Sequence, residues 1–289
     1  LEWLYAHVPG YSEFNRFVIF WRMGDGALEA VRVDPSWQGD GGSVSGVSEF
    51  MRQVLTGFLR AEFAERPDLL AKVVPTYPPG AKRMVRDNGV WARTLMRSNV
   101  ELVTDAVARI VPNGVETADG TVHEGDVLLY GTGYEASRFL APMQVTGRDG
   151  VDLHAQWAGD ARAYLGVTVP GFPNFFCLYG PNTNIVINGS IIYFSECGVR
   201  YVMSLVETLL RSRAASIEVR RDVHDTFNAA VDAENAAMAW GWSPVSSWYK
   251  NEFGRVSQNW PFTLLEYWQR TLAPEPSDYL CVLMPMQIH

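Results

Sequence analysis

Apolar residues near the start of the chain recur at helical spacing. Residues 12–33 place Phe14, Phe17, Val18, Phe20, Trp21 and Met23 on one side of a helical surface, which predicts a helix there. A Gly- and Ser-rich stretch, 39–46, separates it from a second predicted helix that Ser48 would cap. In that helix the apolar positions follow at spacings of three and four: Phe50, Met51, Val54, Leu55, Phe58, Leu59 and Phe63. These aromatic residues predict a packed helical layer, which Pro75 and the run 77–80 end.

Further along, the apolar pattern changes to the alternation of strands. Asn113-Gly114 and Asp119-Gly120 are turn signals that predict a small β-meander. The strands expected there are 100–103, 107–111, 115–117 and, as the last of them, 126–130.

The second half of the chain predicts one more strand and two helices. The strand is 175–179, behind the rigid approach 170–174. Ser190 is expected to cap a helix that runs to about Arg213 and is apolar nearly all round, hence buried on most sides. A second helix is expected over 222–239. Asp222, His224 and Asp225 lie at its start, where they are expected to cap the helix. Together these elements predict an α/β fold.

Two predicted strands run directly into glycine-containing turns. Segment 126–130 leads to Gly131, Thr132 and Gly133, and glycine there would let the backbone approach another group closely. Segment 174–184 repeats the pattern, with the strand ending at Gly180. One such turn is common in α/β proteins, but two at this distance are typical of flavoproteins with two nucleotide-binding domains.

Composition narrows the class of protein. The 289 residues exceed a usual single domain, and 47% apolar with 19% charged residues indicates a globular protein. The net charge of −8 argues against a nucleic-acid groove, and no stretch is apolar enough for a membrane span. Cys177, Cys197 and Cys281 are few and widely spaced, which favours small core residues in a reducing, cytoplasmic location.

The sequence lacks the motifs of several classes of enzyme. The five histidines have no metal-ligand spacing, so no metal site is predicted. No Gly-x-Ser-x-Gly elbow, Cys-x-x-Cys pair or Walker-type phosphate loop occurs. A hydrolase of the usual serine type and a metalloenzyme are therefore disfavoured.

Lys82 and Arg83 form an adjacent cationic pair in a predicted loop. Lysine suits a phosphate as a point charge, whereas the planar fork of arginine suits a developing oxyanion. Position alone favours the alternative, a solvated basic surface loop.

The turn after Gly180 stands shortly before the helix that Ser190 would cap. A helix N-terminus attracts phosphate or an electron-rich ring edge. Uncharged polar side chains surround it: Asn182, Thr183, Asn184 and Asn188. An ordinary strand-to-helix loop is an equally good interpretation of these residues.

Taken together, these motifs resemble the flavin-containing monooxygenases of Baeyer–Villiger type, and within them the hydroxyacetophenone monooxygenase group. The similar segments are 77–83, 126–134, 171–184, the helical insert 5–37, and 247–261 with its Gly254-Arg-Val and Trp-Pro. They follow one another in the family's order over nearly the whole chain.

The resemblance implies roles for individual residues. Lys82 matches the lysine that recognises the 2′-phosphate of NADPH, and Arg83 the arginine that stabilises the flavin peroxide and its adduct with a ketone. The turn Gly131 to Gly133 matches the family's linker between nucleotide domains, with Gly131 in place of alanine. Residues 180–188 match the loop and helix start that face FAD, and Trp248 matches a tryptophan that contacts the nicotinamide cofactor.

The resemblance also implies a fold and a reaction. NADPH would reduce FAD, O2 would add to it, and a ketone would become an ester or lactone. The family's Gly-x-Gly-x-x-Gly loops and its Phe-x-Gly-x-x-x-His fingerprint are missing. The expectation is therefore a partial fold of two dinucleotide-binding domains: residues 1–134 as the C-terminal part of the NADPH-binding domain with a helical insert, and 135–289 as that of the FAD-binding domain.

Alternatives stay open for function and partners. Without phosphate loops the chain could be a non-catalytic remnant or an assembly partner that binds no flavin. An N- or S-oxidising flavin monooxygenase would share much of the architecture. A ketone and O2 are the expected small-molecule partners, and exposed sheet edges favour self-association or pairing with a missing N-terminal segment. An aromatic-rich tail predicts either an aromatic-tolerant pocket or a core cluster: Trp240, Trp242, Trp248, Tyr249 and Phe253.

Overall fold

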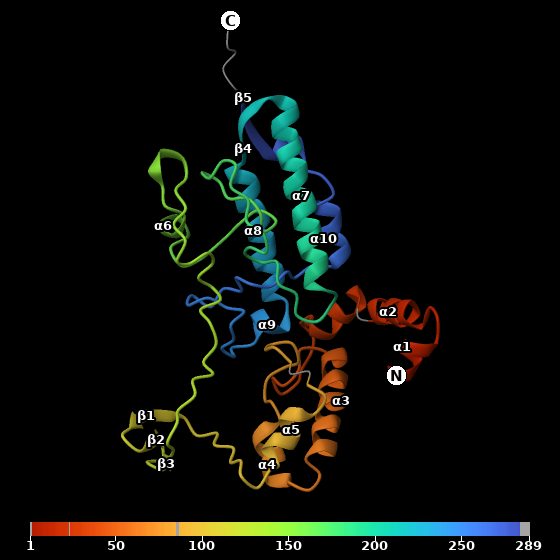
Figure 1. Ribbon diagram of the computed structural model, residues 1–289, viewed down its shortest axis with the longest axis vertical. Coiled ribbons are helices and arrows are strands. Elements are labelled where there is room, and N and C mark those ends of the chain that lie inside the picture. Colours follow the sequence, from red (N-terminus) through yellow and green to blue (C-terminus); the bar gives the residue numbers. More distant parts are fainter. Residues whose placement is uncertain (1, 23, 85–86, 284–289) are drawn as a thin grey trace, which may run out of the picture. The chain divides into compact units, whose positions relative to one another are not determined.

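The computed structural model describes residues 2–22, 24–84 and 87–283, and the chain divides into two units (Figure 1). Unit 1 comprises Leu1–Arg52, Tyr77–Met84 and Ala136–His289, and unit 2 comprises Gln53–Thr76 and Val85–Glu135. One division of the chain lies between Glu135 and Ala136, one residue after the predicted boundary at 134/135. Residues 1–52 and 77–84, however, group with the C-terminal half. The assignment of the two halves to NADPH and FAD stays a prediction.

Unit 1 is mainly helical with one two-stranded sheet. Its elements are α1 (Glu2–His7), α2 (Tyr11–Arg22), η1 (Asp25–Val31), η2 (Arg148–Gly150), α6 (Leu153–Trp157), α7 (Ile191–Ser212), β4 (Ala214–Val219), α8 (Arg221–Ala236), α9 (Ala239–Trp242), α10 (Leu264–Arg270), η3 (Pro276–Asp278) and β5 (Tyr279–Leu283). Helix α3 (Gly46–Glu62) begins in unit 1 and ends in unit 2.

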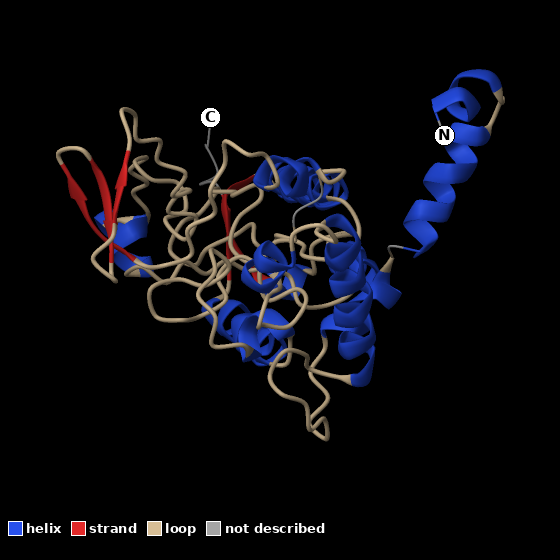
Figure 2. Ribbon diagram, turned by 90° about the horizontal axis from the view of Figure 1, so that it is seen from below, coloured by secondary structure: helices blue, strands red, loops and turns tan. Residues whose placement is uncertain are grey.

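Unit 2 holds short helices and the meander. Its elements are α4 (Pro67–Val73), α5 (Val90–Leu95), β1 (Val107–Val111), β2 (Gly114–Thr117) and β3 (Val122–Glu124). Phe63, Leu69, Ala92 and Leu95 form its buried cluster. The α/β class is thus confirmed in its coarse form, as helices with small antiparallel sheets (Figure 2).

The two N-terminal helices differ from their predicted bounds. The helix predicted over 12–33 ends at Arg22 and resumes as η1; Met23, counted in that helix, lies outside the described residues. Helix α3 is confirmed, but Ser48 lies inside it and is buried. Ser45 takes the capping role instead, since its Oγ accepts from Ser48 N at 3.1 Å.

Helix α7 begins where the sequence predicts. Ser190 is its N-cap and accepts from Ile192 N at 3.2 Å, while Arg213 ends it in the left-handed conformation. The prediction that it is buried on most sides is wrong. Only one face is buried, through Phe194, Cys197, Gly198, Tyr201 and Leu205, and Ile192, Met203 and Leu210 are exposed.

The main core of unit 1 lies under α7. Strands β4 and β5 pair antiparallel, with Val219 opposite Tyr279. Trp260, Phe227 and Tyr267 fill the space between α7, α8 and α10, and the rings of Phe194 and Tyr267 stack with centroids 4.1 Å apart. The helix predicted over 222–239 is confirmed as α8, although no side chain caps it and Asp222 pairs with Arg220 instead.

The meander in unit 2 is confirmed with a different last strand. Val111 lies opposite Gly114 in the first hairpin, and the order is β1-β2-β3. The last strand is β3, not 126–130, which is extended but unpaired and strongly exposed, with Leu129 at 87%. A strand needs a neighbour for its backbone hydrogen bonds, and no described residue supplies one to this segment.

Two other predicted strands are also wrong. Segment 100–103 packs against α4 and α5 without a ladder, through Val100 and Leu102. Segment 175–179 is irregular. Just before it, Asn174 contacts β4: its Oδ1 accepts from Ile217 N at 3.0 Å, its Nδ2 donates to Ala215 O at 3.0 Å, and its backbone N donates to Ile217 O at 3.0 Å.

The three cysteines differ in burial. Cys177 and Cys197 are buried as expected, whereas Cys281 on β5 is exposed, so its predicted core position is wrong. Among the described residues, no helix has the length and apolar character needed to cross a membrane.

Candidate functional site

The loop that carries the cationic pair is a tight turn in unit 1. Gly80 has φ +85°, and a Cβ there would lie 2.5 Å from Val31 Cγ1, so both the conformation and the close approach require glycine. Ala81 N donates to Pro78 O at 3.1 Å and closes the turn. Lys82 follows this turn and is half-buried, with its Nζ 5.5 Å from the ring centroid of Tyr77. Arg83 is exposed.

Arg83 acts electrostatically on two tyrosines from distant parts of the sequence. Burial raises the pKa of Tyr249 to about 12, and Arg83 opposes that rise. Burial likewise raises the pKa of Tyr179, and again Arg83 opposes it. Both phenols are therefore neutral near pH 7. Within residues 2–22, 24–84 and 87–283, no carboxylate forms an ion pair with Arg83, so its charge has no counter-ion in this part of the chain.

The turn 180–184 is bound to the rest of unit 1 by its own side chains. The Tyr179 hydroxyl donates to Asn184 Oδ1 at 2.9 Å, and Asn184 Nδ2 donates to Asn259 Oδ1 at 2.7 Å. Thr183 Oγ1 donates back to Gly180 O at 2.7 Å. These buried polar groups are occupied by the fold. A ligand at this turn would therefore meet its backbone and the adjoining tyrosines.

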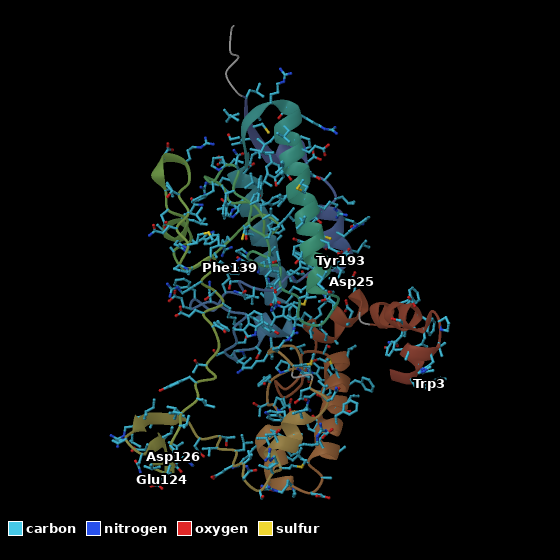
Figure 3. All side chains as sticks on the ribbon, in the orientation of Figure 1. Trp3, Asp25, Glu124, Asp126, Phe139 and Tyr193 are labelled. Carbon is cyan, nitrogen blue, oxygen red and sulfur yellow. The ribbon has the colours of Figure 1, made fainter. Side chains whose placement is uncertain are left out.

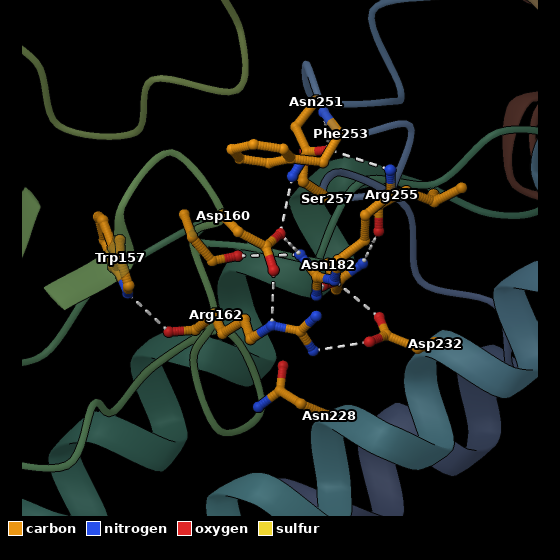
Figure 4. A network of polar contacts seen from close by, with 12 residues as sticks. Trp157, Asp160, Arg162, Asn182, Asn228, Asp232, Asn251, Phe253, Arg255 and Ser257 are labelled. Carbon is orange, nitrogen blue, oxygen red and sulfur yellow. Dashed lines mark hydrogen bonds and ion pairs between the residues drawn. The ribbon is translucent and has the colours of Figure 1, made fainter.

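Asn182 belongs to a network of charged side chains (Figure 4). Its Oδ1 accepts from Arg255 Nη2 at 2.9 Å. Arg255 also contacts Asp160 and Asp232, both of which pair with Arg162. Among the similar segments only the Gly254-Arg-Val motif points to this network, because the members of the network are spread over the chain.

Arg83, Tyr179 and Tyr249 are called the Arg83 cluster below, and Trp248 contacts it through the neighbouring Tyr249. Its ring lies 4.7 Å from that of Tyr249, centroid to centroid, and is partly exposed. Of the aromatic tail, Trp240 and Tyr249 are core residues, whereas Trp242, Trp248 and Phe253 are exposed. The aromatic-tolerant pocket stays a prediction. Sequence reasoning missed Tyr179, although it lies inside the similar segment 171–184, and it named Tyr249 only as a member of the aromatic tail.

The arrangement so far is an exposed guanidinium that acts on two neutral phenols, one of which, Tyr179, is hydrogen-bonded to a polar turn. Such a site suits an anion or a group that becomes negative during a reaction.

Comparison with known proteins finds homologues among the monooxygenases. An uncharacterized monooxygenase of Sinorhizobium fredii is 36% identical over 280 residues, covering 96% of this chain and 42% of its own length. A Baeyer–Villiger monooxygenase of Pseudomonas aeruginosa is 32% identical over 221 residues, covering 76% of this chain and 42% of its own. The chain is a homologue of the Baeyer–Villiger monooxygenases. It spans less than half the length of these relatives, and no protein-family model matches it.

The fold agrees with this homology. The structure of the monooxygenase OTEMO in complex with FAD and NADP matches with a TM-score of 0.68 and 24% identity, over 82% of this chain and 44% of that one. At this identity the match speaks for the fold alone. Membership of the hydroxyacetophenone monooxygenase group stays a prediction.

In this Baeyer–Villiger homologue, Asn188 lies with a residue from the N-terminal segment. Its Nδ2 donates to Asp25 Oδ1 at 3.3 Å, and Asp25 also accepts from Leu264 N at 2.6 Å at the start of α10. Figure 3 shows Asp25 beside Tyr193 at the N-terminal end of α7. Asn188 is thus buried and tied to two segments far from it in the sequence.

The third predicted element, Gly131 to Gly133, lies in unit 2. Gly133 has φ +80°, as a glycine turn requires, but a Cβ at Gly131 would meet no described atom within 4 Å. The expected close approach of this backbone is not present in the described structure. Its place relative to Lys82 and Arg83 stays a prediction.

Proposed function

We propose that the chain is the C-terminal region of an NADPH- and FAD-dependent monooxygenase that inserts oxygen next to a ketone carbonyl to give an ester or lactone. The observation that carries the proposal is the Arg83 cluster. Arg83 acts on Tyr179, and Tyr179 holds Asn184, so two motifs quoted from distant parts of the sequence meet in unit 1. The homology to Baeyer–Villiger monooxygenases supports the reaction class.

Arg83 would supply positive charge to the reacting oxygen. Arginine stays protonated at any physiological pH. Tyr179 and Tyr249 are neutral there, as phenols ordinarily are, and burial raises their pKa values further, so neither is a counter-anion. The charge is thus available to a developing oxyanion. Lys82 would bind the 2′-phosphate of NADPH as a point charge.

The turn 180–184 would border the flavin ring with its backbone. Its conformation is rigid because the side chains of Thr183 and Asn184 form hydrogen bonds within the protein, to Gly180 O and Asn259 Oδ1. Residues Gly131 to Gly133 and Trp248 would contact the cofactors from their predicted positions. Bound FAD and NADPH would supply electron transfer and oxygen activation.

A second candidate function is a non-catalytic remnant or assembly partner. It is favoured by one observation, that the sequence contains no Gly-x-Gly-x-x-Gly loop to hold a pyrophosphate. An N- or S-oxidising monooxygenase is a third reaction type that the same architecture serves.

Flavin retention separates these functions. The purified chain is incubated with FAD, passed through gel filtration and measured for flavin absorbance. Retained flavin supports the monooxygenase, and absence of flavin supports the non-catalytic alternative. With flavin retained, NADPH is added with a ketone, an amine and a sulfide in parallel, and the products are analysed.

Arg83→Ala gives the matched test of the site. It should abolish ester formation while NADPH oxidation survives in part. Arg211→Ala is the control, because Arg211 is an exposed arginine that pairs only with Glu207 on α7. Full ester formation by Arg83→Ala would remove Arg83 from the proposed mechanism.

A further inference from the structure

Arg255 is the most buried charged group in the network of Figure 4, with its side chain 11% exposed. Its guanidinium serves four acceptors. Nε donates to Asp232 Oδ1 at 2.8 Å, Nη1 to Asp160 Oδ1 and Ala161 O at 3.1 Å each, and Nη2 to Asn182 Oδ1 at 2.9 Å. A planar fork can reach all of these at once, which an ammonium group cannot.

The charges around Arg255 balance. Asp160 and Asp232 each give one oxygen to Arg255 and the other to Arg162, at 2.9 and 2.6 Å. Two cations and two anions thus share one cluster. Because buried charges are stable only when paired, the cluster holds the Arg255 fork in one orientation.

The backbone before Arg255 is fixed as well. Asn251 Oδ1 accepts from Phe253 N and Arg255 N, at 3.1 and 3.0 Å, and Gly254 in this turn has φ +78°. The Asn251 amide also donates to Asp160 Oδ1 at 2.7 Å. These hydrogen bonds within the protein therefore fix the orientation of the Arg255 backbone from which the guanidinium extends.

Asn182 is the residue on which this arrangement converges. It has φ +58°, a left-handed conformation that asparagine tolerates better than most residues. Its Nδ2 donates to Val256 O and Asn259 O, at 2.8 and 3.1 Å, and its backbone N donates to Ser257 O at 3.0 Å. The Oδ1 is left for Arg255, so the side chain is held on both its donor and its acceptor side.

We propose that Arg255 is a positioning residue, which acts through Asn182 to fix the backbone of the 180–184 turn where it is to border the cofactor. This inference rests on the cofactor-facing role proposed for that turn. In this role Arg255 would act on the cofactor only through the turn, because the acceptors of its guanidinium are Asp232, Asp160, Ala161 and Asn182. A mainly structural role would stabilise every part of unit 1 alike, whereas a positioning role is concentrated at one turn.

Amide hydrogen exchange tests the proposal without any cofactor. Arg255→Lys keeps the charge balance but cannot reach Asn182 and both carboxylates together, so peptides covering 180–184 should exchange at least about tenfold faster. Peptides from β4 should not change. Arg211→Lys is the control and should leave both regions as in the unmodified chain.

Asn182→Ala supplies a second variant and closes a double-mutant cycle. It leaves the charge cluster intact, so it should fold even if Arg255→Lys does not, and it too should accelerate exchange at 180–184. If Arg255 acts through Asn182, the double variant should exchange no faster than Asn182→Ala alone. Additive effects, equal acceleration in β4, or unchanged exchange in Asn182→Ala would each overturn the proposal.

FAD retention by the same variants separates the two proposals. Weaker retention by Arg255→Lys and Asn182→Ala, with normal retention by Arg211→Lys, supports positioning for the cofactor. If the unmodified chain retains no FAD, the proposed function fails, and the exchange measurement still decides whether Arg255 holds the turn.

Discussion

The Tyr179 hydroxyl donates a 2.9 Å hydrogen bond to Oδ1 of the buried Asn184, and Arg83 acts on the same phenol. One side chain thus links the predicted catalytic arginine to the predicted cofactor-facing turn. Tyr179→Phe removes only the hydroxyl. We expect the free energy of unfolding to fall by about 1 kcal/mol, since one hydrogen bond to a buried acceptor is lost.

Urea unfolding of the purified chain measures this change. Tyr130→Phe is the matched control, because Tyr130 is 71% exposed. Equal stability of Tyr179→Phe and the unmodified chain would show that the hydrogen bond contributes nothing in solution.

The N-cap of α7 gives a second prediction. Ser190→Ala leaves Ile192 N without its side-chain acceptor, which should lower the free energy of unfolding by about 1 kcal/mol. Ser195→Ala in the same helix is the control, since Ser195 bonds only to the carbonyl of Ile191 and alanine favours helix. Thermal unfolding followed by circular dichroism compares the two. A larger loss for Ser195→Ala would contradict the assigned cap.

The one-sided burial of α7 gives a third prediction. Leu205 is fully buried, whereas Leu210 is 75% exposed. Leu205→Ala should cost about 2–5 kcal/mol through lost burial and a cavity, and Leu210→Ala less than about 1 kcal/mol. Denaturant unfolding of both variants measures the difference. Equal costs would mean that the exposed face of α7 is covered in solution by another chain.

His224 makes stability depend on pH. Burial lowers its pKa below the ordinary 6.5, against a hydrogen bond from its Nδ1 to Asp225 that favours the charged form. The unfolded chain therefore binds the proton first as pH falls. The contribution of His224 to the free energy of unfolding is fully present above about pH 6.5. It declines below that pH, by at most about 1.4 kcal/mol per pH unit.

Unfolding at pH 7.5 and 5.5 tests the pH dependence. His224→Gln should show a smaller loss of stability between these two values than the unmodified chain, and His7→Gln, at an exposed position, should show the same loss. An unchanged loss in His224→Gln would assign the effect to other groups.

Features that depend only on neighbouring residues could be predicted from the amino-acid sequence. Ser190 starts α7 because a hydroxyl two residues before an amide can accept from it, and Asp119-Gly120 reverses the chain because glycine adopts positive φ. Several short segments in one order, among them 77–83, 126–134 and 171–184, carried the resemblance to the Baeyer–Villiger monooxygenases, among which homologues are found.

Only the tertiary structure decided where distant groups meet. Segments 126–130 and 175–179 have the composition of strands, yet a strand exists only where another backbone lies alongside, and neither segment belongs to a sheet of the described residues. The partners of Asn182 and Asn184, which are Arg255 and Asn259, lie more than seventy residues away. Local spacing carries no signal for such contacts, because they depend on how the whole core packs.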